Sequence, residues 1–285
     1  MKHAVLTKIG GPESLELQET TIPKPLKDEL LVKVDHAGVA FADVMMRHGK
    51  YPSAPKLPFT PGYDICGTVV ETGDNVSDFN VGDKIIALTQ FGGYAQYATV
   101  HHGRAIKVPE LITTSEAVVL VLNYISAYQM LTKYKKLTSG NTVLIHSAAG
   151  GVGTAALQIA RTMGLKTYGT CSTGKTKIVE QNGGIAIDYK TVDFAQQMRK
   201  LEPDGVDFIL DPIGGNHWIQ SKSVLKPKGT LVGFGFFSMF QNDKVIGSIM
   251  DIGKIMIPLI LGSMLPGAKK FHMYSIKPNQ YGKIQ

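Results

Sequence analysis

Cysteine is scarce in this sequence, and its scarcity excludes several classes of protein. The chain has 285 residues and only two cysteines, Cys66 and Cys171, which lie far apart. Two cysteines cannot form a disulfide framework, and neither has partners at metal-ligand spacing. The first residues, MKHAVLTKIG, contain no apolar core of the kind that a secretory signal needs. Both absences lead us to expect a reducing, cytoplasmic location.

The sequence also lacks a long uninterrupted hydrophobic run. Its most apolar late segment, VIGSIMDIGKIMIPLILGSML at 245–265, contains Asp251, Lys254 and Pro258. A membrane-spanning helix needs about 20 mostly apolar residues, so we expect no membrane span. The segment is better explained as a helix that packs on a sheet or on a partner subunit. A membrane contact is the less favoured alternative.

Basic residues do not form blocks longer than two, although they outnumber acidic residues. The chain has 30 Lys and Arg against 23 Asp and Glu, a formal net charge of +7. This sign permits a phosphate-bearing cofactor, RNA or a membrane surface as partner and does not choose among them. Because the charges are scattered, a solvated surface is the default interpretation, and no specific nucleic-acid partner is expected.

Two patterns of secondary structure follow one another along the chain. Residues 1–110 contain short runs rich in Val, Ile, Thr and Tyr, such as ELLVKVDHAGV and ICGTVVETG, separated by Gly, Pro, Asp and Asn. This pattern predicts a compact β-rich region. Beyond about residue 114, a helix with a capping signature at Glu116 precedes an alternation of apolar strands and helices. Such alternation predicts a parallel sheet covered on both faces, so the fold class is α/β.

A glycine-rich turn, LIHSAAGGVG at 144–153, joins the first of these strands to its helix. A helix N-terminus offers unpaired N–H groups and the positive end of a dipole, which stabilise an anion. Side chains at 150, 151 and 153 would hold a pyrophosphate away from those donors. A tight turn alone also favours glycine, but inside a βαβ unit the pattern favours dinucleotide binding.

The end of the second strand indicates which dinucleotide is preferred. Folds that prefer NAD place an acidic residue there, about 20 residues after the glycines, to bind the ribose hydroxyls. The corresponding segment TCSTGK, at 170–175, contains no acid and offers Ser172, Thr173 and Lys175. A lysine would pair with a 2′-phosphate, so NADPH is the expected cofactor, with an ordinary polar loop as the alternative.

Several segments together resemble one protein family. These are HAGVAFADVMMRHGKYPSAPKLPFTPGYDICGTVVETGDNVSDFNVGDKIIAL, FGGYAQYATV, LNYISAYQML and VLIHSAAGGVGTAALQIAR. They are similar to the medium-chain dehydrogenase/reductase superfamily, and within it to the zinc-independent quinone oxidoreductases, in the branch of the vesicle amine transport protein-like reductases. The resemblance is continuous from the first strand to about residue 235 and weaker beyond it.

The resemblance implies a fold and a set of site residues. It implies a GroES-like β-rich catalytic domain at 1–122, a doubly wound Rossmann domain binding NADP(H) at 123–262, and a C-terminal segment at 263–285 that returns toward the catalytic domain. Tyr51 matches a tyrosine at the quinone pocket. The residues that match cofactor-binding positions are Asn123 and Ser126 near the nicotinamide, Ala148, Gly150, Gly151, Val152 and Gly153 at the pyrophosphate, Ser172, Lys175 and Tyr189 at the 2′-phosphate, and Gly233, Phe234 and Gly235 along the cofactor.

The zinc ligands of related dehydrogenases are missing from the matching positions. GVAFAD has no cysteine, and PGYDICG has Tyr63 and Asp64 where zinc-dependent relatives have His and Glu. A catalytic zinc ion needs three protein ligands, which Cys66 cannot supply, so we expect no metal. Without a metal, the chemistry suits an acceptor that takes hydride readily, a quinone or a conjugated enone. Tyr51 could contact that acceptor or could serve packing alone.

Two departures from the family keep a second interpretation open. Many relatives have Asn where this chain has Ala40, and members of the family usually continue well beyond KPNQY, whereas this chain stops at YGKIQ. The expected function is an NADPH-dependent reductase, a homodimer by resemblance. The alternative is a nucleotide-binding interaction protein with vestigial catalysis, associated with a membrane or RNA. A zinc alcohol dehydrogenase is a third, disfavoured possibility.

Overall fold

The chain divides into two compact units, with the division between Leu122 and Asn123. The computed structural model describes residues 1–51, 53–241, 244–245 and 249–276. Residues 277–285, the last part of the C-terminal segment expected at 263–285, lie outside the described residues. Among those described, none of the helices is both long enough and apolar enough to cross a bilayer.

The N-terminal unit is built on antiparallel strands. Its five-stranded sheet has the order β6-β3-β4-β5-β7, and β1 pairs with β2 in a separate ribbon. Side chains such as Leu30, Ile65 and Ile85 are completely buried in its core, as expected for strands with one apolar face. The elements are β1 (Lys2–Leu6), β2 (Leu15–Glu19), β3 (Glu29–Ala37), α1 (Phe41–Arg47), β4 (Asp64–Thr72), β5 (Lys84–Leu88), β6 (Tyr97–His101), β7 (Ala105–Lys107) and α2 (Thr114–Val119).

The predicted helix after residue 113 begins as expected but is interrupted. Thr113 caps α2 by accepting a hydrogen bond from the Glu116 amide, and the Glu116 carboxylate accepts one from the Thr113 amide at 2.9 Å. After one turn of π-helix at Leu120–Tyr124, a second helix, α3 (Ile125–Lys133), follows. The interruption places Asn123 on a widened turn, of the kind that often occurs at functional sites.

The C-terminal unit is a doubly wound parallel sheet, which confirms the predicted fold class. Its strand order is β10-β9-β8-β11-β12-β15, and all neighbouring strands run parallel. The elements are β8 (Thr142–Ile145), α4 (Gly151–Thr162), β9 (Lys166–Cys171), α5 (Thr176–Gln181), β10 (Ile185–Asp188), α6 (Phe194–Leu201), β11 (Val206–Asp211), α7 (Asn216–Ser223), β12 (Leu225–Gly233), the short strands β13 (Phe240–Gln241) and β14 (Lys244–Val245), α8 (Ile249–Ser263) and β15 (Lys270–Met273).

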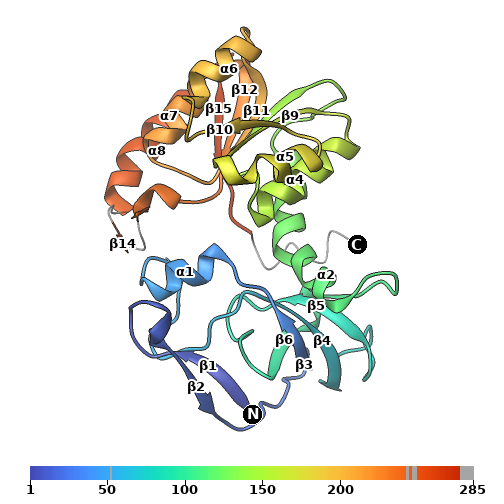
Figure 1. Cartoon of the computed structure of the whole chain (residues 1–285). Coiled ribbons are helices and arrows are strands. Elements are labelled where there is room, and N and C mark those ends of the chain that lie inside the picture. The colour runs from blue at the N-terminus through green and yellow to red at the C-terminus, as the bar shows by residue number, and fades with distance from the viewer. Residues whose placement is uncertain (52, 242–243, 246–248, 277–285) are drawn as a thin grey trace. The chain divides into compact units, whose positions relative to one another are not determined.

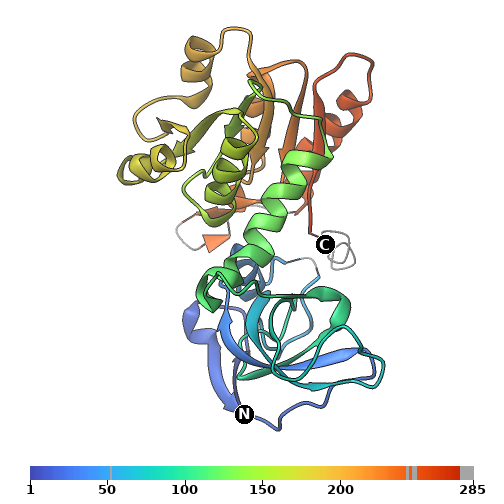
Figure 2. The same cartoon turned by 90° about the vertical axis from the view of Figure 1, so that its right-hand side faces the viewer.

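Helices cover both faces of this sheet. The yellow-green helices α4 and α5 lie to one side of it and the orange-red helices α7 and α8 to the other (Figure 1; Figure 2 gives the view after a quarter turn). Right-handed crossovers explain the arrangement, because the chain moves from β8 outward to β10 and then crosses back to β11. The strand order therefore reverses between β8 and β11, and ligands bind in such folds at the carboxyl ends of the strands at this point.

The C-terminal boundary of this unit differs from the one expected. We placed the end of the Rossmann domain at residue 262, with 263–285 leaving it, but β15 pairs with β12 as the last strand of the same sheet. Phe271 in β15 is buried, with its ring 5.1 Å from that of Trp218. Burial of this aromatic pair keeps the strand in the unit, which extends to Ser275. The apolar segment before it forms α8, and the buried Leu259 of α8 joins the same core.

Candidate functional site

The glycine-rich turn brings bare backbone to the start of α4. After β8, Ser147 adopts a positive φ of 53°, and α4 begins at Gly151 with no side-chain cap on Gly150. A methyl group added at Gly153 would lie 2.3 Å from the Ser147 carbonyl oxygen and 2.7 Å from Cα of Ala148. Only glycine therefore lets the helix approach the turn this closely. The first N–H groups of α4 have no intrahelical partner, as an anion-binding site requires.

Asn123 lies against the same turn. A methyl group added at Gly151 would lie 2.8 Å from Nδ2 of Asn123, so the amide side chain covers the first residue of α4. Ser126, one turn further along in α3, is 5 % exposed. The structure thus places Asn123 beside the glycine turn, with Ser126 buried behind it.

The residues expected at a 2′-phosphate lie at the ends of β9 and β10. Ser172 precedes a short 3-10 turn, Thr173–Lys175, whose Lys175 is exposed and forms no ion pair within the described part of the chain. Tyr189 directly follows β10, and its amide donates to the Cys171 carbonyl at 3.2 Å, which fixes it beside the end of β9. Half of the Tyr189 side chain is exposed. A cation and a phenol therefore face solvent at adjacent strand ends.

The last predicted cofactor residues lie at the end of β12, where Gly233 is the final residue of the strand and Phe234 and Gly235 follow it. Two backbone hydrogen bonds hold this segment. The Phe234 amide donates to the Asp211 carbonyl at 3.1 Å, and the Tyr274 amide donates to the Gly233 carbonyl at 2.8 Å. A methyl group at Gly233 would lie 2.8 Å from the Trp218 ring. The glycine is thus needed for core packing, whatever else the strand end binds.

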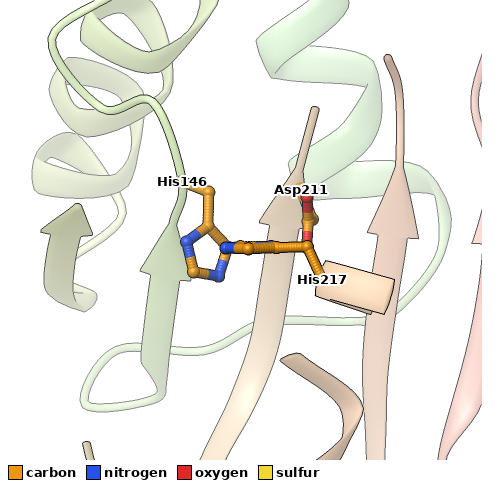
Figure 3. A group of neighbouring side chains, drawn as sticks. All are labelled: His146, Asp211 and His217. Atoms are coloured by element: carbon orange, nitrogen blue, oxygen red, sulfur yellow. The ribbon is translucent and has the colours of Figure 1, made fainter. Parts of the chain in front are cut away.

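A cluster of His146, Asp211 and His217 lies between β8, β11 and α7 (Figure 3). Asp211 Oδ2 is 2.7 Å from His217 Nδ1 and accepts a hydrogen bond of 2.7 Å from the Ser221 hydroxyl. The same hydroxyl is 3.1 Å from His146 Nε2. Sequence analysis missed this cluster, although His146 and Asp211 both stand at the ends of predicted apolar strands.

The protonation states of the two buried members follow from their surroundings. Burial lowers the pKa of His146 to about 3, so its imidazole is neutral near pH 7. Burial acts to raise the pKa of Asp211, but the hydrogen bonds from His217 and Ser221 and the neighbouring imidazoles outweigh it, and the pKa is lowered. Asp211 is therefore a carboxylate. His217 differs from both because its side chain is 22 % exposed.

A cavity of about 400 Å³ opens beside this cluster. It lies at the carboxyl ends of β8, β9, β10 and β11, the edge at which doubly wound sheets bind their ligands. Polar and aromatic side chains share its lining, which is formed by Ser147, Thr170, Tyr189, Val192, Asp193, Phe194, Ile213, His217 and Gln220. The cavity therefore connects the glycine turn, through Ser147, with Tyr189 and with the histidine cluster.

In the N-terminal unit, Tyr51 contacts one of the residues that replace zinc ligands. The hydroxyl groups of Tyr51 and Tyr63 are 2.8 Å apart, and their rings meet edge to face. Cys66 is buried in β4, and burial raises the pKa of its thiol to about 11, which disfavours the thiolate that binds zinc. The matching positions hold Tyr63 and Asp64 and no cysteine in GVAFAD, so they do not supply the three ligands that a catalytic zinc ion needs.

A pair of buried carboxyl groups in the same unit also escaped prediction. Asp64 is 3 % exposed, and its Oδ1 has no hydrogen-bond partner among the described residues. Burial, reinforced by the charge of Asp43, raises the pKa of Asp64 to about 7. Asp43 itself accepts hydrogen bonds from the amides of Ala40 at 2.9 Å and Gly62 at 3.1 Å. Ala40 thus contributes only a backbone donor at this point.

Comparisons with known proteins agree with this architecture. Residues 26–110 match the family "Alcohol dehydrogenase GroES-like domain", and residues 151–271 match "Zinc-binding dehydrogenase". The synaptic vesicle membrane protein VAT-1 homolog of Rattus norvegicus is 38 % identical over 248 residues, which cover 86 % of this chain and 61 % of that protein. The chain thus spans about three fifths of the length of this relative.

Two further comparisons point to the same family. The quinone oxidoreductase of Homo sapiens is 34 % identical over 240 residues, covering 82 % of this chain and 73 % of that protein. The crystal structure of Escherichia coli quinone oxidoreductase complexed with NADPH superposes with a TM-score of 0.83 at 25 % identity, covering 99 % of this chain and 82 % of the other. Together with the GroES-like match, these findings confirm both the predicted fold and the resemblance. The chain belongs to the quinone oxidoreductase family of the medium-chain dehydrogenases/reductases.

Proposed function

We propose that this chain is an NADPH-dependent oxidoreductase that reduces a quinone or a related α,β-unsaturated carbonyl compound without a catalytic zinc ion. The observation that carries the proposal is the close approach of bare backbone at Gly153 to Ser147, beside an uncapped helix N-terminus. This cradle fits a pyrophosphate, since a side chain would fill the space that the anion and the helix share.

The residues that would hold the cofactor lie along the carboxyl edge of one sheet. Backbone N–H groups of Gly151, Val152 and Gly153 would bind the pyrophosphate, while Asn123, covering the turn, would limit access of water. Ser126 would support that helix from within. Gly233, Phe234 and Gly235 would present backbone along the cofactor at the end of β12. When bound, the reduced nicotinamide supplies the hydride, and the protein contributes binding and orientation.

Preference for NADPH over NADH is proposed from the ends of β9 and β10. Lys175 is exposed and unpaired within the described residues, and no acid occurs between residues 170 and 175. An ammonium group and the Ser172 hydroxyl would favour a 2′-phosphate, which an acid would repel. The half-exposed Tyr189 would contribute its hydroxyl or its ring. The relative whose structure contains NADPH supports the same choice.

The acceptor is proposed from the chemistry that the N-terminal unit lacks. The residues at the family's zinc positions do not fit the ion, so no Lewis acid there would polarise an alcohol or a simple carbonyl. A quinone or enone accepts hydride without that help, because the negative charge that develops is delocalised. Tyr51, paired with Tyr63 through their hydroxyl groups, would stack on or donate to this flat acceptor.

A homodimer is proposed for the assembled protein. Helix α8 exposes large apolar side chains, among them Met250, Ile257 and Leu261, and β15 is the last strand of its sheet. Exposed apolar patches of this kind mark interaction surfaces. Sedimentation of the purified chain at micromolar concentration should give the mass of two copies, and a monomer throughout would contradict the assembly.

The test of the proposed function is oxidation of NADPH in the presence of a simple quinone such as 1,4-benzoquinone, followed by absorbance at 340 nm. We expect turnover that a chelator does not reduce and that is at least tenfold slower with NADH. Loss of activity on chelation would contradict the zinc-free chemistry. Binding of NADPH without turnover over a panel of quinones and enones would contradict the reductase and leave only a nucleotide-binding role.

A further inference from the structure

We propose that His146, Asp211 and His217 form a binding site for one Zn²⁺ ion in the C-terminal unit, away from the positions where related dehydrogenases bind zinc. One ligand atom from each of these residues lies within 4.8 Å of the others, at the carboxyl edge of the parallel sheet (Figure 3). The proposal is independent of the oxidoreductase activity, because it concerns binding of the ion alone.

Three separate elements fix the ligand positions. The His146 amide donates to the Leu210 carbonyl at 2.9 Å, which locks the end of β8 to β11. The Asp211 carboxylate is oriented by the Ile213 amide, which donates to Oδ1 at 2.8 Å and leaves Oδ2 directed at His217. His217 is in the first turn of α7. A site assembled from rigid elements loses little conformational entropy when it binds an ion.

The donor atoms suit zinc in type. Two imidazoles and one carboxylate form the His₂-carboxylate set of open zinc sites, whereas Mg²⁺ and Ca²⁺ prefer six or more oxygen ligands. The Ser221 hydroxyl lies 3.1 Å from His146 Nε2, 2.7 Å from Asp211 Oδ2 and 3.5 Å from His217 Nδ1. Ligands around a tetrahedral zinc ion lie about 3.3 Å apart. The three ligand atoms lie within 4.8 Å of one another, so the largest separation must shorten by up to about 1.5 Å, and the Ser221 hydroxyl, which lies among them, must turn away when the ion binds.

The surroundings provide the remaining requirements of a metal site. The Thr170 hydroxyl is 3.0 Å from His146 Nδ1 and can accept a hydrogen bond from a protonated Nδ1, which leaves Nε2 to bind the ion. His146 and Asp211 are almost completely buried, so water competes little for the ion there. His217 also lines the cavity of about 400 Å³, which gives the ion a path from solvent and an open coordination position.

A purely structural role is the competing explanation. Without an ion, hydrogen bonds link Thr170, His146, Ser221, Asp211 and His217 in one chain, and every donor can find an acceptor. That explanation predicts a stable cluster with no affinity for metal. The two explanations therefore differ in a direct binding measurement.

The experiment titrates the chelator-stripped, untagged chain with Zn²⁺ in a calorimeter, and with Co²⁺ while recording the visible spectrum. We expect one equivalent to bind and Co²⁺ to give the intense bands of tetrahedral coordination. His217→Ala should weaken binding at least tenfold. His102→Ala is the matched control, because it removes a partly exposed histidine that lies 2.9 Å from Asp78, outside the cluster, and it should leave binding unchanged.

Three results would overturn the proposal: no equivalent bound by the wild-type chain, equal binding by wild type and His217→Ala, or loss of binding in His102→Ala. Should His217→Ala fail to fold, His217→Gln retains the volume and removes the imidazole, and the same tenfold loss is expected. Anomalous scattering at the zinc edge from crystals of the wild-type chain grown with Zn²⁺ gives a direct readout. A peak anywhere other than among the three side chains would also contradict the site.

Discussion

Replacing Asp64 by asparagine should change how the stability of this protein depends on pH. The folded chain raises the pKa of Asp64 from 3.8 to about 7, through burial first and the charge of Asp43 second. The folded state therefore keeps a proton that the unfolded chain releases near pH 4. The stability that this proton contributes is fully present below pH 3.8 and is lost as the pH rises through about 7.

The magnitude follows from the shift. One pKa unit corresponds to about 1.4 kcal/mol, and the group is half titrated at pH 7, so between pH 5 and pH 7 the wild-type chain loses about 2 kcal/mol through this group alone. Asparagine has nearly the same shape and no charge, so Asp64→Asn should not show this loss. Relative to wild type, the variant should gain about 3 kcal/mol in free energy of unfolding between pH 5 and pH 8.

The assay is equilibrium unfolding in urea at pH 5 and pH 8, followed by circular dichroism. Asp74→Asn, which removes an exposed carboxylate from the same unit, is the control and should follow wild type at both pH values. If Asp64→Asn also follows wild type at both pH values, then Asp64 titrates as an ordinary exposed acid, and the reasoning from burial is wrong.

Four further outcomes are expected. Gly153→Ala should abolish NADPH binding in fluorescence titrations, because the added methyl group would lie 2.3 Å from a backbone carbonyl oxygen. Gly174→Ala is the control and should bind NADPH as wild type does, because its added methyl group would have no atom within 4 Å. Lys175→Ala should weaken NADPH binding about tenfold and leave NADH binding unchanged; equal losses would contradict the 2′-phosphate role. Tyr51→Phe should raise KM for the quinone without changing the Kd for NADPH, and an unchanged KM would leave Tyr51 a packing residue. Thr113→Ala should lower the free energy of unfolding by about 1 kcal/mol through loss of the α2 cap, measured by urea unfolding.

Features encoded within one short segment could be predicted from the sequence. The glycine turn at 147–153 lies between an apolar strand and an amphipathic helix, so its place at the carboxyl end of β8 followed directly. The capping pair of Thr113 and Glu116 is likewise local, and the structure has it as expected. The interruption of the helix at Leu120–Tyr124 was not predictable, because the apolar residues continue through it without a Gly or Pro.

Features that depend on which strands become neighbours could not be read from the sequence. His146 and Asp211 meet because β8 and β11 pair, although 60 residues of chain containing two other strands lie between these elements. The buried pair of Asp43 and Asp64 likewise depends on tertiary packing. Strand β15 was missed because the run of Lys270–Met273 is short and alternates polar with apolar residues. Its pairing with β12 and the contact of Phe271 with Trp218 identify it in the structure.

The central claim is that the carboxyl edge of the C-terminal sheet binds a dinucleotide bearing a 2′-phosphate. Calorimetric titration of the folded chain with NADPH and with NADH tests this claim most directly. The account predicts one NADPH bound per chain, at least tenfold more tightly than NADH. The absence of NADPH binding by a chain whose circular dichroism shows it to be folded would contradict the account.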